Sequence, residues 1–152
     1  MPKLTGVLRW NVGLVSEALR LPVRETVEYF RDGRIIGDLI ERRLATKLDF
    51  TPEPVRGGGV VLRDSGNFVW RVRMLTDHVA FAPQSMFGVG RKFRATEFRD
   101  FLGTFQGYIV ADVHAWPEVP YTSIRTAEVW SLASAGGQMK REPALAALFP
   151  KE

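Results

Sequence analysis

The residues of this chain that could do chemistry gather in one short stretch, GGGVVLRDSGNFVWRVRMLT at 57–76. Two runs of strand-forming residues flank the turn signal DSGN at 64–67, which predicts a β-hairpin. Arg71 and Arg73 are two residues apart and therefore lie on one face of the second strand. A hairpin of this kind binds Mg²⁺ when each strand contributes a carboxylate, so its residue types decide whether it can be a catalytic centre.

Composition and charge limit the class of protein. A chain of 152 residues fits one domain with a sizeable core, and 45% hydrophobic content is typical of a folded protein. No apolar run is long enough to cross a bilayer and no signal peptide is evident, so we expect a cytoplasmic protein with no membrane partner. The absence of cysteine excludes disulfide and thiolate chemistry. The net charge of +4 is compatible with nucleic acid without requiring it.

The periodicity predicts an α/β (α+β) fold, with helices around a small mixed sheet. Residues 1–32 have mainly helical spacing with a break at Pro22, and a longer helix is expected over 34–48. The prolines and glycines of TPEPVRGGG predict a loop before the hairpin. Later elements are expected to be a third strand at 79–81, a loop at 84–94, a helix over 96–105, a buried strand at 107–113, a strand at 121–124, a helix ending near 136 and a loosely docked tail. We expect one compact domain, with 1–33 as a helical N-terminal extension packed on a core of 34–152.

The segment LVSEALRLPVRETVEYFRDGR at 14–34 allows two interpretations. One is a helix-turn-helix, in which the small Ala18 permits close helix crossing and the second helix presents polar residues. These residues would be Arg24, Glu25, Glu28 and Tyr29. The other is an ordinary helical hairpin packed on the sheet, which the two glutamates favour because phosphates repel them.

A series of stretches in the rest of the chain resembles a family of small restriction-endonuclease-like proteins of the PD-(D/E)xK nuclease superfamily. The stretches are DGRIIGDLIERRLA, GGGVVLRD, VWRVRMLT, VAFAPQSMFGVGRKF, EFRDFLGTFQGYIVADV and WPEVPYTSI. The resemblance implies a restriction-endonuclease-like core of a helix, a three-stranded meander, a helix and a strand. It also implies metal-assisted phosphodiester hydrolysis, in which acids on two hairpin strands bind Mg²⁺ and a Lys or Arg two residues later orients the water.

This chain departs from the family pattern at the metal-binding positions. Val61 stands where the resemblance puts the first acid and Arg71 where it puts the second, while Arg73 keeps the basic position. A valine cannot ligate Mg²⁺, and a guanidinium about 6 Å away repels it by roughly 5 kcal/mol at an effective dielectric near 20. We therefore expect no metal or other cofactor. Only an unusual site built from Glu41 on the preceding helix, Asp64 and Arg73 would keep Mg²⁺-dependent catalysis.

The residues of that unusual site also have ordinary structural interpretations. Asp64 begins the turn, where aspartate is common because its side chain accepts backbone hydrogen bonds. Glu41 could be a solvated helix residue paired with a neighbouring cation. The only histidines, His78 and His114, lack metal-ligand spacing, and we interpret both as structural or incidental.

Loss of the acids leaves a basic surface. Polar and basic residues of the loop after the hairpin could join the strand arginines to contact phosphates and base edges. The predicted DNA-binding residues are Arg71, Arg73, Gln84, Ser85, Arg91, Lys92 and Arg94. In an alternative interpretation, Arg71 pairs with Glu41 or Asp64 in a buried ion pair that replaces the metal.

The first functional hypothesis is a double-stranded DNA-binding protein with a degenerate active site, acting as a recognition or regulatory subunit or as the partner of an active nuclease. The second is an active Mg²⁺-dependent endonuclease that uses Glu41 and Asp64. The third is a protein-interaction module that does not bind nucleic acid. Restriction-like folds commonly dimerise on two-fold symmetric sites, so the resemblance also implies a homodimer.

Overall fold

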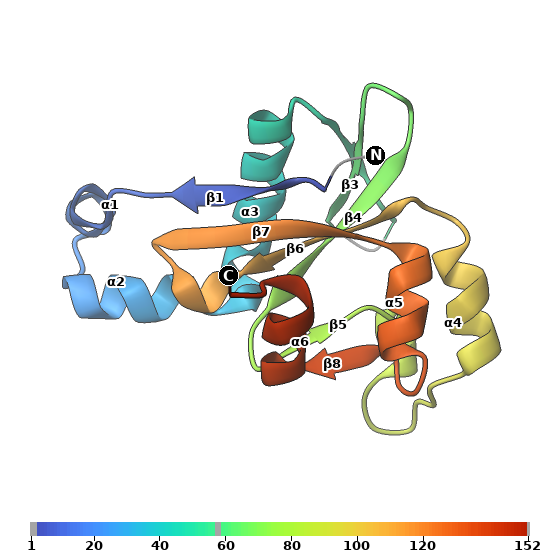
Figure 1. Cartoon of the computed structure of the whole chain (residues 1–152). Helices are drawn as coiled ribbons and strands as arrows, with labels where there is room; N and C mark the ends of the chain where they lie inside the picture. The colour runs from blue at the N-terminus through green and yellow to red at the C-terminus, as the bar shows by residue number, and fades with distance from the viewer. Residues whose placement is uncertain (1–2, 57–58, 152) are drawn as a thin grey trace.

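A mixed sheet in the strand order β1-β7-β6-β4-β3-β2 forms the centre of the structure (Figure 1). The computed structural model describes residues 3–56 and 59–151. The strands are β1 (Thr5–Arg9), β2 (Thr51–Pro54), β3 (Val60–Arg63), β4 (Val69–Leu75), β6 (Gly107–Asp112) and β7 (Glu118–Arg125). β4 and β6 are parallel, and the other neighbours are antiparallel. A second sheet pairs β5 (His78–Ala80) with β8 (Gln138–Lys140).

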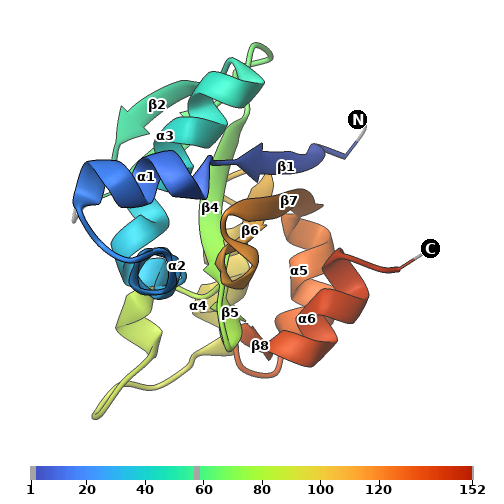
Figure 2. The same ribbon diagram turned by 90° about the vertical axis from the view of Figure 1, so that its left-hand side faces the viewer.

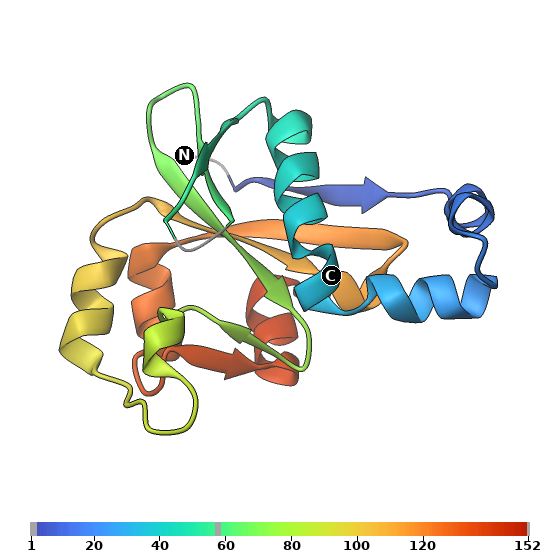
Figure 3. The same cartoon turned by 180° about the vertical axis from the view of Figure 1, so that it is seen from behind.

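Helices cover both faces of the main sheet. They are α1 (Val12–Leu19), α2 (Val23–Phe30), α3 (Gly33–Leu48), α4 (Ala95–Leu102), α5 (Thr126–Ala133) and α6 (Arg141–Leu148), with short 3₁₀ turns η1 (Gln84–Met86) and η2 (Val113–Ala115). Figure 2 shows α3 on one side of the sheet and α5 and α6 on the other, and Figure 3 shows α3 lying across its face. No helix in residues 3–56 or 59–151 has the length and apolar character needed to cross a membrane. The expected mixed α/β class is confirmed.

Two hydrophobic cores lie on opposite faces of the sheet, and β6 contributes to both. Its Tyr108 and Val110 belong to the core beneath α4, α5 and α6, while Ile109 and Ala111 belong to the core beneath α3. Every residue of β6 is buried. This explains the unbroken apolar run GYIVA, because a central strand covered on both faces has no solvent side to alternate with.

Helix α3 follows its sequence signals closely. The Asp32 side chain caps it by accepting the backbone N–H of Arg34 at 2.9 Å. Ile36, Ile40 and Leu44 repeat at every fourth residue and are fully buried against the sheet. The predicted helix over 34–48 is therefore confirmed to within one residue.

The beginning of the chain differs from the helical prediction. Residues 5–9 form β1, which pairs antiparallel with β7 at the edge of the main sheet. Gly6 faces the Tyr121 ring so closely that a Cβ there would collide with it, and Leu8 is buried. The helices expected next are present as α1 and α2, separated by Pro22, but the buried small residue of α1 is Ser16, whereas Ala18 is exposed.

The three-stranded meander contains different strands from those predicted. Thr51–Pro54, expected to be a loop, forms β2 and pairs with β3, whereas β5 leaves the main sheet to pair with β8. Prolines are tolerated in β2 because it is an edge strand, where missing N–H donors need no partner. The prediction of a loop at Thr51–Pro54 was wrong because proline and glycine content reports only local backbone preferences. It does not show whether a segment lies at the edge of a sheet, where a strand can contain prolines.

The C-terminal segment is docked more firmly than expected. It forms β8 and α6, and α6 places Ala144 and Leu148 in the core. The Arg141 guanidinium binds the buried Asp112 carboxylate through two contacts of 2.9 Å. A buried ion pair and an apolar helix face together attach this segment to the end of β6.

Candidate nucleic-acid interface

Glu41 and Asp64, the two acids of the catalytic alternative, both accept hydrogen bonds from groups in the hairpin. The Glu41 carboxylate is half-buried and accepts the backbone N–H of Val60 at 3.2 Å, and burial is the main cause that raises its pKa. The Asp64 carboxylate accepts the backbone N–H groups of Gly66 and Phe68, both at 2.9 Å, and the indole N–H of Trp70 at 3.0 Å. Although burial raises the pKa of Asp64, these three donors outweigh it and lower the pKa.

The two acids make their contacts at opposite ends of β3. Glu41 contacts the first residue of β3, whereas Asp64 follows its last residue, so about 13 Å of extended chain lies between the two contact points. No group of three or more His, Cys, Asp or Glu side chains in the described residues is arranged to hold a metal ion. Mg²⁺ is usually held by one or two carboxylates together with waters and substrate phosphates. Here the two carboxylates accept backbone N–H groups at opposite ends of β3, an arrangement that does not suit one shared ion.

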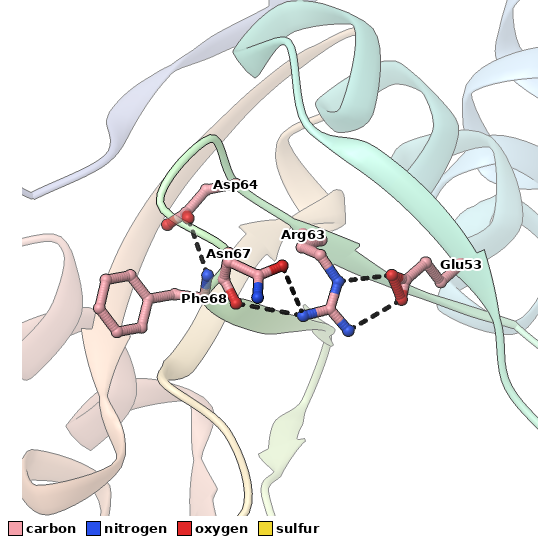
Figure 4. A network of polar contacts seen from close by, with 5 residues as sticks. All are labelled: Glu53, Arg63, Asp64, Asn67 and Phe68. Carbon is pink, nitrogen blue, oxygen red and sulfur yellow. Dashed lines mark hydrogen bonds and ion pairs between the residues drawn. The ribbon is translucent and has the colours of Figure 1, made fainter.

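An ion pair engages Glu53, the residue paired with Val61 on the neighbouring strand. Val61 lies opposite Glu53 of β2, and the Glu53 carboxylate binds the Arg63 guanidinium, with Nη2–Oε2 at 3.1 Å. Arg63 also donates to the backbone and side-chain oxygens of Asn67, at 3.1 and 3.2 Å (Figure 4). These contacts stabilise the hairpin and its turn, and they use Glu53 for structure.

Arg71 has an aromatic environment and no acidic partner. Its guanidinium lies 4.8 Å from the centre of the Phe101 ring and 5.1 Å from that of Phe105. No carboxylate in residues 3–56 or 59–151 lies within 4.0 Å of it, and its Nε–H is buried without a hydrogen-bond acceptor. Burial, followed by repulsion from Arg73, lowers the pKa of Arg71. The alternative of a buried ion pair with Glu41 or Asp64 is therefore wrong.

Arg73 is held at a neighbouring position on the same strand face. Its guanidinium lies 5.2 Å from the centre of the Tyr108 ring, and its Nη1 donates to the Val72 carbonyl oxygen at 3.1 Å. Burial raises the pKa of Tyr108 to about 12, so the hydroxyl remains protonated and donates to the Phe81 carbonyl oxygen. The ring and the carbonyl oxygen orient the Arg73 guanidinium, whose remaining N–H groups can donate to another acceptor.

A hollow of about 690 Å³ opens beside Arg73, near the carboxyl ends of the parallel strands β4 and β6. Its lining comes from the junction of α2 with α3, the end of β4, β5, η1 and η2. A second hollow of about 540 Å³ shares four lining residues with the first, namely Arg73, His78, Ala80 and Gln84. We call the combined surface the basic groove, and we define it by Arg31, Arg34, Arg73, His78, Gln84 and His114.

The charges in the basic groove do not cancel. Among the lining acids, Asp32 is bound by Arg34 at 3.0 Å, and Glu28 lies 3.5 Å from Arg24. Arg31 and Arg73 have no carboxylate partner within 4.0 Å in the parts of the chain described by the structure. The Arg31 Nε donates to the Trp116 carbonyl oxygen at 3.1 Å, which orients its guanidinium. The groove thus presents two oriented cations suited to an anionic ligand.

A projecting loop borders the basic groove. Gly88 and Gly90 adopt φ values of 98° and 77°, and Val89 between them is fully exposed. Figure 2 shows this loop, drawn in yellow-green before α4, extending away from the body of the protein. Arg91 follows, and its Nη1 donates to the Gln84 carbonyl oxygen at 3.0 Å, which ties the loop to the groove.

The structure brings together part of the predicted DNA-binding set. Arg73 and Gln84 line the groove, and Arg91 contacts Gln84 from the loop. Ser85 and Lys92 are exposed in the same region of the chain. The other two members lie differently. Arg71 stacks on aromatic rings and Arg94 pairs with Glu97 at 2.9 Å, so their contact with DNA stays a prediction.

Sequence reasoning missed four groove residues. Arg31 and Arg34 belong to the cation-rich segment around the start of α3, which was a usable signal. His78 and His114 follow β4 and β6, and ligands often bind beyond the carboxyl ends of adjacent parallel strands. That rule would have grouped the two histidines only if the parallel pairing had been known.

Comparison with family models, with curated proteins and with solved structures finds no match for this chain. The class that its own structure defines is a mixed α/β protein with a basic groove at the carboxyl ends of two parallel strands. Membership of the PD-(D/E)xK superfamily stays a prediction based on the sequence stretches quoted above.

Proposed function

We propose that this protein binds double-stranded DNA through the basic groove and does not cleave it with a metal ion held at the hairpin. The observation that carries the proposal is the pair formed by Arg31 and Arg73. Both guanidiniums are oriented by backbone carbonyl oxygens and neither has a carboxylate within 4.0 Å in the described residues. Phosphate oxygens are suitable partners for such groups, and phosphate contacts supply much of the affinity of proteins for DNA.

The order of elements supports a restriction-endonuclease-like core. A helix (α3), a three-stranded antiparallel meander (β2, β3, β4), a helix (α4) and a strand parallel to the meander (β6) follow one another along the chain. This is the order that the resemblance implies. In such a core, Val61 and Arg71 replace the metal-binding acids, so the protein acts as a recognition or regulatory subunit, or as the partner of an active nuclease.

The projecting loop supports duplex DNA as the ligand. An exposed Val89 between two glycines, followed by Arg91 and Lys92, combines an apolar tip with flanking cations. Proteins that bind the minor groove combine these two features, because the apolar side chain wedges between base steps while cations contact the narrow groove. In this arrangement, the basic groove contacts phosphates and the loop contacts the adjoining minor groove.

A salt series of duplex-binding measurements tests the proposal. We expect affinity to fall steeply with salt, and we expect Arg31→Ala and Arg73→Ala each to flatten the slope of log K against log salt by about 0.9. Arg125→Ala is the matched control, because Arg125 is exposed and pairs with Gly107 at the opposite end of β6 from the groove. This control should leave the slope unchanged.

Three outcomes would contradict the proposal. Unchanged slopes for both groove variants, with intact circular dichroism, would exclude the groove as the interface. Absence of salt-dependent duplex binding would favour the protein-interaction module. Plasmid cleavage in Mg²⁺ or Mn²⁺ that is lost in Glu41→Ala or Asp64→Ala would instead support the active endonuclease.

A further inference from the structure

The two edges of the main sheet differ in how open they are to another strand. At one edge, β2 reads TPEP, and its two prolines lack the N–H groups that a pairing strand would need. At the other edge, β1 reads TGVLR and contains no proline. Natural proteins usually block exposed edges with prolines, charges or a covering element. The one charged residue of β1, Arg9, stands at its last position, so the uncharged edge formed by residues 5–8 calls for an explanation.

The register of β1 with β7 shows which backbone groups point outward. Trp10 donates its N–H to the Pro117 carbonyl oxygen at 3.0 Å, and the Leu4 carbonyl oxygen accepts the N–H of Ser123 at 2.9 Å. Hydrogen-bonded pairs alternate in an antiparallel ladder, so residues 4, 6, 8 and 10 bond to β7. The N–H and C=O groups of the alternate residues, 5, 7 and 9, therefore point away from β7, and none has a hydrogen-bond partner in the described part of the chain.

We propose that β1 pairs antiparallel with β1 of a second copy of this chain, across a two-fold axis at Val7. In this register, Val7 faces its own counterpart and Thr5 faces Arg9 of the other copy. Each outward N–H then meets an outward C=O, and no two like charges stand directly opposite each other. The strand is thus complementary to itself, as an isologous interface requires, and the two main sheets become one continuous sheet.

Exposed apolar side chains beside β1 could be buried in the proposed dimer and so stabilise it, which a short strand pair alone does not. A pair of five-residue strands is marginal by itself. Two residues separate β1 from the helical hairpin α1–α2, which extends past the end of the sheet (Figure 1). Its exposed apolar residues are Leu14, Leu19, Leu21, Val23 and Tyr29. Antiparallel pairing brings this hairpin towards the amino end of the partner's β1, where these residues can be buried.

Site-directed crosslinking tests the register, because the natural chain contains no cysteine. In the proposed dimer, the Cα atoms of the two Val7 residues are about 5.5 Å apart, a distance that a disulfide can bridge. The two Arg9 residues are offset by four strand positions, about 13 Å, which is too far. Under mild oxidation, Val7→Cys should give a covalent dimer, whereas the matched variant Arg9→Cys should remain monomeric on a non-reducing gel.

Analytical ultracentrifugation gives the second test. The natural chain and Val7→Ala should sediment as dimers, since both keep the outward N–H, whereas Val7→Pro should sediment as a monomer with an unchanged circular dichroism spectrum. A natural chain that is monomeric at all concentrations would overturn the proposal. Equal crosslinking of the two cysteine variants, or a dimer that survives Val7→Pro, would assign the interface to another surface. These outcomes do not depend on DNA, so the dimer and the proposed function can fail separately.

Discussion

Substitution of Arg141 tests how the C-terminal helix is attached to the sheet. Its guanidinium makes two contacts of 2.9 Å with the Asp112 carboxylate, which is 5% exposed, and Nη1 also donates to the Thr76 carbonyl oxygen at 3.2 Å. Arg141→Met keeps a long apolar side chain but leaves the carboxylate buried with one donor, the backbone N–H of His114 at 3.2 Å. The loss of stability should therefore come from the unpaired charge of the Asp112 carboxylate and not from a smaller side chain at position 141.

The expected cost follows from that burial. Breaking a buried ion pair by removing one partner lowers the free energy of unfolding by about 3–5 kcal/mol. In a chain of this length, each kcal/mol lowers the melting temperature by about 2–4 °C, so Arg141→Met should melt roughly 6–20 °C below the natural protein. Asp112→Asn combined with Arg141→Met should cost less than the two single substitutions added together, because the charge that needed a partner is also gone.

Thermal and urea unfolding of the two single variants and the double variant measures these quantities. Arg125→Met is the control. Arg125 is exposed and has no carboxylate within 4.0 Å among the residues that the structure describes, so its loss should change stability by no more than about 0.5 kcal/mol. The reasoning would be refuted if Arg141→Met lost less than about 1 kcal/mol while the control behaved as expected. Additive effects in the double variant would show that the two side chains act independently.

Three further substitutions have expected outcomes that unfolding measurements check. Glu41→Gln keeps an acceptor for the Val60 N–H and removes the carboxylate. Because burial raises the pKa of Glu41 in the folded protein, its ionised form opposes folding at pH values above that pKa. The substitution should therefore stabilise the protein at pH 7 by less than about 1 kcal/mol. This gain should shrink as the pH falls through the raised value, and a constant gain would contradict it. Asp64→Ala removes the acceptor of three hydrogen bonds and should cost about 1–3 kcal/mol, so an unchanged urea midpoint would argue against its role in the turn. Gly107→Ala sets a Cβ against the Ile124 carbonyl oxygen and should cost about 3 kcal/mol, and a melting temperature equal to that of the natural protein would contradict this close approach of the strands.

Local patterns in the sequence determined several elements correctly. The spacing of Ile36, Ile40 and Leu44 predicted α3, and the apolar run beginning at Gly107 predicted the buried strand β6. The turn signal at 64–67 predicted the hairpin of β3 and β4. These predictions succeeded because helix periodicity, burial on both strand faces and turn chemistry depend on residues close together in the chain.

The tertiary structure alone decided which distant segments meet. β1 pairs with β7 from near the other end of the chain, and a proline-rich edge strand replaces β5 in the meander. The basic groove likewise depends on contacts between distant parts of the chain, since Arg31, Arg73 and His114 come from separate elements that meet where β4 and β6 run parallel. The sequence determined that Val61 and Arg71 cannot bind a metal. Where the remaining cations gather depends on strand order and register, which arise from packing across the whole domain and leave no local periodic signal.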